Sequence, residues 1–230
     1  MYPFYFDNTM VILIPAMILT MYAQGKINKA YSKFSRIRTV KGFTGMQTAR
    51  AILDKNGLTN VSIELVGGKL SDHYDPRTKV LRLSQDVYYG NTIAANSIAA
   101  HEVGHAIQHA KAYAPLAFRN SMVPVVNIAS NLSWFFILGG MFFSALPQLF
   151  TIGVLMFSAS VVFQLVTLPV ELNASSRAIS LLGEMGILSA GEIPQGRKML
   201  NAAALTYIAA ASAAVAQLIR LLVLRDRNDR

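Results

Sequence analysis

The sequence contains no cysteine and few charged residues. The lack of cysteine excludes disulfide bonds and thiolate metal ligands, and it is compatible with a reducing compartment. Charged residues make up 14% of the 230 residues, whereas a soluble domain of this length usually carries about a quarter. Hydrophobic residues make up 53%, so the composition indicates a protein of the lipid bilayer.

Acidic residues are scarcer than basic ones, and the formal net charge is +9. A nucleic-acid-binding protein usually interleaves basic and aromatic residues on a polar domain, so we expect no nucleic acid as a partner. Instead, no Asp or Glu lies between Asp7 and Asp54, and six basic residues follow the first apolar stretch: Lys26, Lys29, Lys33, Arg36, Arg38 and Lys41. We expect this basic loop to lie near anionic lipid headgroups.

Four apolar stretches are candidates for membrane spans. Residues 122–143 and 147–168 each supply 22 residues, close to the length that about 30 Å of hydrocarbon requires. Residues 203–224 also predict a span, although a buried helix is the alternative because the stretch contains Gln217 and Arg220. Residues 9–23 are shorter, and aromatic side chains could anchor them at the interface: Tyr2, Phe4, Tyr5 and Phe6.

The basic loop also predicts the orientation. Positive charges follow the first apolar stretch instead of preceding it, which argues against a cleaved signal peptide. The positive-inside bias places residues 24–121 and 169–202 in the cytoplasm. The C-terminal "RDRNDR" would then lie outside, which its three arginines disfavour, so the side of the C-terminus stays open. The predicted parts are a first transmembrane helix (1–24), a cytoplasmic domain (25–121), a transmembrane hairpin (122–168), a cytoplasmic helix and loop (169–202), and a last transmembrane helix with its tail (203–230).

The cytoplasmic domain is predicted to be of the α+β class. Thr44 and Gln47 fit a capping box at the start of a helix that Gly57 ends, and residues 61–66 alternate like a strand. Residues 68–84 predict a hairpin with its turn at Asp75-Pro76-Arg77. Asn91 could cap a helix from Thr92 to about Lys111. We therefore expect a mainly α membrane protein, with about four transmembrane helices and one small α+β domain.

That last helix carries "IAAHEVGHAIQHA", which holds three of the four histidines. Residues four apart lie on nearly the same face of a helix, so His101 and His105 can bind one zinc ion. Glu102 lies beside them, where a carboxylate can take a proton from water that zinc activates and pass it to a leaving amine. The alternative is a helix with two exposed histidines that bind no metal.

A catalytic zinc site needs a third protein ligand. His109 lies about 12 Å from His101 along the helix, too far for both to bind one ion. It is therefore a supporting, substrate-facing or simply polar residue. Glu171 follows the third span on the side assigned to the motif, and acidic residues near lipid are usually functional. The alternative for Glu171 is an interfacial helix-cap charge, whereas Glu184 and Glu192 are expected to be solvated.

Four pieces resemble the YugP-type neutral zinc metallopeptidases of bacteria: "LSDHYDPRTKVLRLS", "AAHEVGHAIQHA", "YAPL" and "LPVELNASSRA". The layout is more distantly similar to the HtpX and CAAX prenyl proteases, membrane gluzincins with a later ligand in E-x-x-A-D. The resemblance implies a gluzincin-like zinc-protease domain, with Glu171 as third ligand and Ala174 as the alanine. Ser175 stands where those proteases have Asp, so another group must orient a ligand histidine.

The resemblance to gluzincins also implies that a substrate backbone pairs with a sheet edge beside the motif helix, and the hairpin around Lys79–Leu83 is the local candidate. Oxyanion stabilisers are usually His, Tyr or Arg. Arg177 is the first candidate and His73 the second. Arg177 could instead pair with lipid phosphate, and His73 could only close the hairpin.

Together these features predict a zinc metalloendopeptidase of the bacterial cell membrane, with one zinc ion per chain and its active site facing the cytoplasm. Its expected partners are peptide or membrane-protein substrates, whose identity the sequence leaves open together with the oligomeric state. Two alternatives are an intramembrane zinc protease, and a zinc-binding membrane scaffold without catalytic activity. The first is disfavoured because "NTIAANSIA", before His101, is too polar to lie centrally in lipid. A transporter is disfavoured because no predicted span carries paired ionisable residues.

Overall fold

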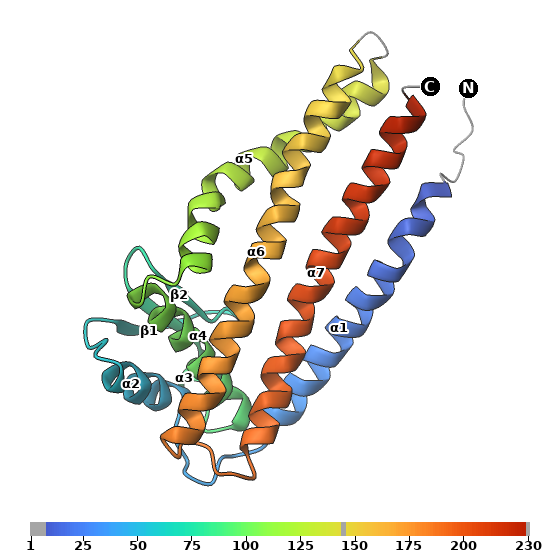
Figure 1. Ribbon diagram of the computed structural model, residues 1–230. Helices are drawn as coiled ribbons and strands as arrows, with labels where there is room; N and C mark the ends of the chain where they lie inside the picture. The colour runs from blue at the N-terminus through green and yellow to red at the C-terminus, as the bar shows by residue number, and fades with distance from the viewer. Residues whose placement is uncertain (1–7, 144–145, 229–230) are drawn as a thin grey trace. The chain divides into compact units, whose positions relative to one another are not determined.

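The computed structural model describes residues 8–143 and 146–228, and the chain forms two compact units (Figure 1). The first, here the membrane unit, comprises Met1–Ala23, Phe118–Leu168 and Thr206–Arg230. The second, here the site unit, comprises Gln24–Ala117 and Pro169–Leu205. The proposed aromatic anchors Tyr2, Phe4, Tyr5 and Phe6 lie outside the described residues.

The structure has four candidate membrane-spanning helices in its described residues, in agreement with the expected number of about four. Four helical segments in the described chain are long and apolar enough to span: Asn8–Phe34, Ala114–Phe142, Gln148–Glu184 and Ile193–Asp226. They correspond to η1 (Asn8–Leu13) with α1 (Ile14–Phe34), and to α5 (Ala114–Phe142), α6 (Gln148–Glu184) and α7 (Ile193–Asn228). Each is longer than the apolar stretch that predicts it, because the helical backbone continues into polar sequence.

Small residues bring the helices of the membrane unit together. Gly153 of α6 packs against α5, and a buried cluster of Ile137, Phe150, Val154 and Leu221 joins α5, α6 and α7. At the ends of the chain, Arg220 Nε of α7 donates to Thr9 Oγ1 at 3.2 Å. This bond places the start of the first span beside the end of the last one, as an even number of spans requires.

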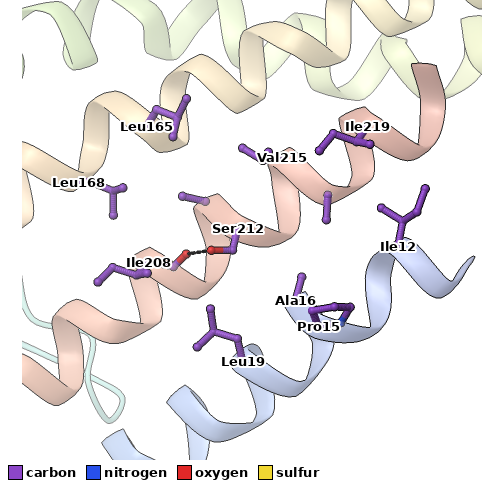
Figure 2. Close-up of a pocket in the computed structure, with 12 residues that line it drawn as sticks. Ile12, Pro15, Ala16, Leu19, Leu165, Leu168, Ile208, Ser212, Val215 and Ile219 are labelled. Atoms are coloured by element: carbon purple, nitrogen blue, oxygen red, sulfur yellow. Dashed lines mark hydrogen bonds between the residues drawn. The ribbon is translucent and has the colours of Figure 1, made fainter. Parts of the chain in front are cut away.

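An apolar pocket of about 510 Å³ lies in the membrane unit, between η1 and α1 on one side and α6 and α7 on the other (Figure 2). Its walls include Ala16, Leu165 and Val215. The hydroxyl of Ser212, which also lines it, donates to the Ile208 carbonyl at 2.8 Å. The pocket therefore suits hydrocarbon and offers no chemistry for a polar substrate.

The site unit is built on a mixed three-stranded sheet. Its strands are β1 (Ser62–Val66), β2 (His73–Asp75) and β3 (Val80–Ser84), in the order β1-β3-β2. β1 pairs with β3 in parallel, with Ile63 opposite Leu81, and β2 pairs with β3 in antiparallel. The helices are α2 (Gly45–Lys55), the short α3 (Gln85–Tyr88) and α4 (Ile93–Ala110), together with the site-unit parts of the long helices.

Local signals in the sequence placed most of these elements correctly. Thr44 and Gln47 form both bonds of the capping box, and Gly57 adopts a φ of +72° after the helix. The Asp75 carboxylate accepts from Arg77 N at 2.9 Å and closes the predicted turn. The predicted cap of α4 is off by one residue, because Thr92 Oγ1, not Asn91, accepts from Ala95 N.

One strand of the hairpin proposed for substrate pairing is not a sheet edge. The segment Lys79–Leu83 forms most of β3, which is the central strand and has a partner on each side. Its backbone groups are already paired, so it cannot add a substrate strand. The hairpin was evident in the sequence, but the parallel pairing of β1 with the other side of β3 was not. In the described sheet, the edges belong to β1 and β2.

We predict that Gly153→Ala destabilises the membrane unit. A Cβ at Gly153 would lie 2.7 Å from Ile137 N and 2.8 Å from Ser133 O, which are backbone atoms that cannot move away. Overpacking of this kind costs about 1–3 kcal/mol. Thermal unfolding in detergent should show a Tm lower by roughly 2–10 °C. Gly139→Ala is the control, because its Cβ would meet only Leu149 Cδ1, at 3.3 Å; equal Tm values for both variants would contradict the packing argument.

Candidate metal centre

Two helices of the site unit bring three potential ligands together. His101 and His105 lie one turn apart on α4, and Glu171 lies on α6. One ligand atom from each lies within 4.8 Å of the other two. The imidazole rings stand at 87° to one another, with centroids 4.8 Å apart. The structure thus gathers the three residues that the sequence nominates as metal ligands.

The spacing of these atoms fits one zinc ion. Glu171 Oε2 lies 3.2 Å from His101 Nε2 and 3.6 Å from His105 Nε2. Around a tetrahedral zinc with bonds of about 2.0–2.1 Å, neighbouring ligand atoms are about 3.3 Å apart. Glu171 is only 4% exposed, so its negative charge needs a cationic partner. Two imidazoles and one carboxylate also leave the fourth position open, as in catalytic zinc sites.

The second nitrogen of each histidine has a hydrogen-bond partner. His105 Nδ1 lies 3.0 Å from Gln108 Oε1, and His101 Nδ1 lies 3.1 Å from Ser175 Oγ. An amide oxygen only accepts, so His105 carries its proton on Nδ1 and directs the Nε2 lone pair toward Glu171. Both rings are held in the orientation that a metal ligand needs.

Ser175 supplies the support that its sequence position left in doubt. Its hydroxyl contacts His101 directly. Gln108 supports the other ligand histidine, and sequence reasoning missed it. The available signal was its position three residues after His105, which puts both side chains on adjoining parts of one helix face.

Gly104, inside the motif, allows α4 and α6 to approach closely. A Cβ at this position would lie 2.8 Å from the Ala174 carbonyl oxygen and 3.1 Å from Ala174 Cα. Ala174 itself is fully buried, and its side chain is a single methyl group. The backbones can therefore approach until the Glu171 carboxylate reaches both imidazoles.

Glu102 lies on α4 beside the ligands and is partly buried. Burial raises the pKa of its carboxyl group, the neighbouring His101 and His105 lower it, and the net shift is upward. A general base works best when its pKa lies near the working pH. The position and the direction of this shift both suit a proton acceptor next to a metal ion.

Comparison with known proteins agrees with this centre. A family model described as "Putative neutral zinc metallopeptidase" matches residues 9–226. The chain is 46% identical over 221 residues to "Putative membrane protease YugP" of Bacillus subtilis (strain 168), which covers 94% of this chain and 98% of that protein. The chain belongs to this metallopeptidase family. No solved structure matches it significantly.

The two predicted oxyanion stabilisers, Arg177 and His73, each have a hydrogen-bond partner outside the three candidate ligands. Arg177 Nε donates to Asn173 Oδ1 at 2.7 Å. His73 is exposed on β2, and its Nδ1 bonds the Ser71 carbonyl at 2.8 Å. Their role in the reaction stays a prediction. His109, on the ligand side of α4, shares a 2.9 Å hydrogen bond with the Tyr74 hydroxyl of β2.

Both Glu184 and Glu192 were predicted to be exposed to solvent, and this prediction is wrong for Glu192. Glu184 is exposed, as expected. Glu192, by contrast, is 6% exposed, and its carboxylate accepts from Val40 N at 2.8 Å, Ser189 N at 2.7 Å and Ser189 Oγ at 2.8 Å. These donors lower its pKa against the opposing effect of burial. Glu192 thus fastens the start of α7 to the loop after α1, which a local sequence pattern cannot reveal.

We predict that Glu171→Ala removes the metal. The variant loses the only carboxylate that bridges both imidazoles among the described residues, so zinc content should fall far below the one ion per chain expected of the wild type. Metal analysis of detergent-purified protein measures this. Glu184→Ala is the control, because it removes an exposed carboxylate from the same helix. Unchanged zinc content in Glu171→Ala would exclude Glu171 as a ligand.

Proposed function

We propose that this protein is a membrane-integrated zinc metalloendopeptidase with its active site on the cytoplasmic side. The observation that carries the proposal is the convergence of His101, His105 and Glu171 at zinc-ligand spacing, with Glu102 beside them. Membership of a zinc metallopeptidase family and 46% identity to a protein named as a membrane protease support it. The basic loop after the first span supports the cytoplasmic assignment.

The chain's own residues have defined tasks in peptide hydrolysis. Zinc, when bound, would lower the pKa of water and polarise the scissile carbonyl. Glu102 accepts a proton from the attacking water and transfers it to the leaving amine, so its carboxyl group ends the cycle as it began. His101, His105 and Glu171 would hold the ion, while Ser175 and Gln108 keep the rings aligned.

The corrected sheet suggests where a substrate lies. β2 is an edge strand, and its Tyr74 bonds to His109 on the ligand side of α4. An extended peptide can add to such an edge through backbone hydrogen bonds, which tolerates varied side chains. We therefore propose β2 as the substrate-pairing strand for peptides or membrane-proximal segments of proteins. His73, on this same strand, and Arg177 remain the proposed oxyanion stabilisers.

The two alternatives make different predictions. An intramembrane protease would carry its motif on a spanning helix, whereas α4 is not among the candidate spans of the described chain. A non-catalytic scaffold would bind zinc but cleave no peptide. The activity of a Glu102 variant separates the scaffold from the protease.

We predict that Glu102→Gln retains zinc but loses peptide cleavage by roughly 10²–10⁴-fold, the usual contribution of a general acid–base. The amide has nearly the same shape and cannot accept the proton. Casein cleavage and zinc content should be measured together, with Glu64→Gln, an exposed carboxylate on β1, as the control. Wild-type protein that is fully loaded with zinc and cleaves no peptide would favour the scaffold.

We also propose that the start of the basic loop contacts anionic phospholipid of the same membrane. Lys26, Lys29 and Lys33 are exposed and spaced three and four residues apart, so they share one face of α1. Ile27 and Phe34, on the adjoining face of α1, are buried in the core of the site unit, and Lys33 Nζ lies 5.7 Å from the Phe34 ring centroid. Because α1 continues without a break from the first span, this lysine face begins where a lipid headgroup layer is expected.

Removing the lysine face should weaken selection of anionic lipid. Each Lys near the surface contributes about 1 kcal/mol, so Lys26→Gln/Lys29→Gln/Lys33→Gln should lose most of the preference. Electron paramagnetic resonance of spin-labelled phosphatidylglycerol and phosphatidylcholine in reconstituted vesicles measures it. Lys69→Gln/Arg77→Gln/Lys79→Gln removes the same charge from exposed positions of the sheet region and should keep the preference. Equal losses in both triple variants would reject the lysine face as the contact.

A further inference from the structure

Gln108 is a fully buried amide whose polar atoms are all used. Its Oε1 lies 3.0 Å from His105 Nδ1, and its Nε2 donates to the Val170 carbonyl at 2.8 Å and to Asn173 Oδ1 at 3.0 Å. Its exposure is 0%. A glutamine has one accepting oxygen and two N–H donors, so this arrangement satisfies the group and links α4 to two successive turns of α6.

The partners fix which way the Gln108 amide points. Both neighbours of Nε2 are oxygens, so a reversed amide would place Oε1 against two acceptors. The oxygen must therefore face His105 Nδ1. Because an amide oxygen cannot donate, the proton of neutral His105 resides on Nδ1, and Nε2 carries the free lone pair.

Arg177 fixes the other end of the chain of bonds. Its Nε donates to Asn173 Oδ1 at 2.7 Å, and a guanidinium group can only donate. Asn173 Oδ1 therefore accepts from both Arg177 and Gln108, and Asn173 cannot reverse either. Because the permanently charged Arg177 can only donate, the donor and the acceptor of each hydrogen bond between Arg177 and His105 are determined.

His101 has a different kind of support. Its Nδ1 partner is the Ser175 hydroxyl, which can donate or accept by rotating about its bond. That contact holds the ring but dictates no tautomer. Of the two imidazoles, only His105 is constrained by a network whose donors and acceptors are all determined.

We propose that Gln108 is a positioning residue that sets the tautomer and ring orientation of His105, with Asn173 and Arg177 holding it in place. The proposal rests on His105 as a metal ligand, as in the proposed function, but not on catalysis. Loss of such a supporting bond usually lowers metal affinity by about 10–100-fold. Arg177 thus acts on the centre through two amides, independently of any contact with substrate.

The test is zinc affinity by competition with a chromophoric chelator, on full-length protein in detergent. Gln108→Met keeps the volume and removes every hydrogen bond, and we expect binding about 10–100-fold weaker. Asn96→Leu is the matched control. Asn96 is also a fully buried amide of α4, and its Nδ2 also donates to two carbonyl oxygens, those of Phe43 and Thr92. Its zinc affinity should equal that of the wild type.

A further readout separates positioning from general stability. The visible spectrum of bound Co²⁺ should change in Gln108→Met and stay unchanged in Asn96→Leu. Wild-type zinc affinity or an unchanged Co²⁺ spectrum in Gln108→Met, or equal weakening in Asn96→Leu, would overturn the proposal. None of these readouts involves cleavage, so a failure of the protease assignment would be seen separately.

Discussion

The structure of this site depends on one constraint: two imidazole nitrogens and one carboxylate oxygen must lie about 3.3 Å apart to share a metal ion. The observed separations of 3.2 Å and 3.6 Å meet it. The spacing of the two histidines follows from the turn of α4, but the carboxylate must come from another helix. That helix can approach only because Gly104 has no Cβ and faces the backbone of Ala174. A buried carboxylate beside two neutral rings is costly without a cation, so the packing and the metal depend on each other.

A single stretch of α6 supplies the third candidate ligand and the residues that support the two histidines of α4, directly or through Gln108. Glu171 contributes a ligand atom, and Ser175, one turn later, holds His101. Asn173 and Arg177, also one turn apart, hold Gln108 and through it His105. Since all four residues belong to one rigid helix, a shift or rotation of α6 changes the ligand and both supporting contacts together. The geometry of the centre is thereby set by how one pair of helices packs.

The sequence could predict what local geometry controls. The spacing of His101, Glu102 and His105 brings the two histidines to one face of any helix. Because acidic residues are scarce, few candidates other than Glu171 existed for the third ligand. The capping box at Thr44 and the turn at Asp75 are local in the same sense. One miss was local, because Thr92 and not Asn91 caps α4. The other misses depend on residues distant in the chain. Glu192 is buried by a donor 152 residues away, and β3 becomes central only because β1 pairs with its second side. Gln108 lies three residues from the histidine that it supports, but no pattern near the motif specifies its bonds to Val170 and Asn173.

Support of His101 by a hydroxyl has an electrostatic consequence. An Asp bonded to His101 would add a further negative charge to those of Glu171 and Glu102, and would make the imidazole a stronger donor to the metal. The Ser175 hydroxyl orients the ring without that charge. Gln108 likewise orients His105 as a neutral group, although it is tied to a cationic side chain through Asn173. A cation held this way keeps more of its charge for a polarised carbonyl or a water molecule, because fewer neighbouring anions neutralise it. The site therefore combines fixed ligand geometry with neutral supporting groups, because the two rings are oriented by an amide and a hydroxyl.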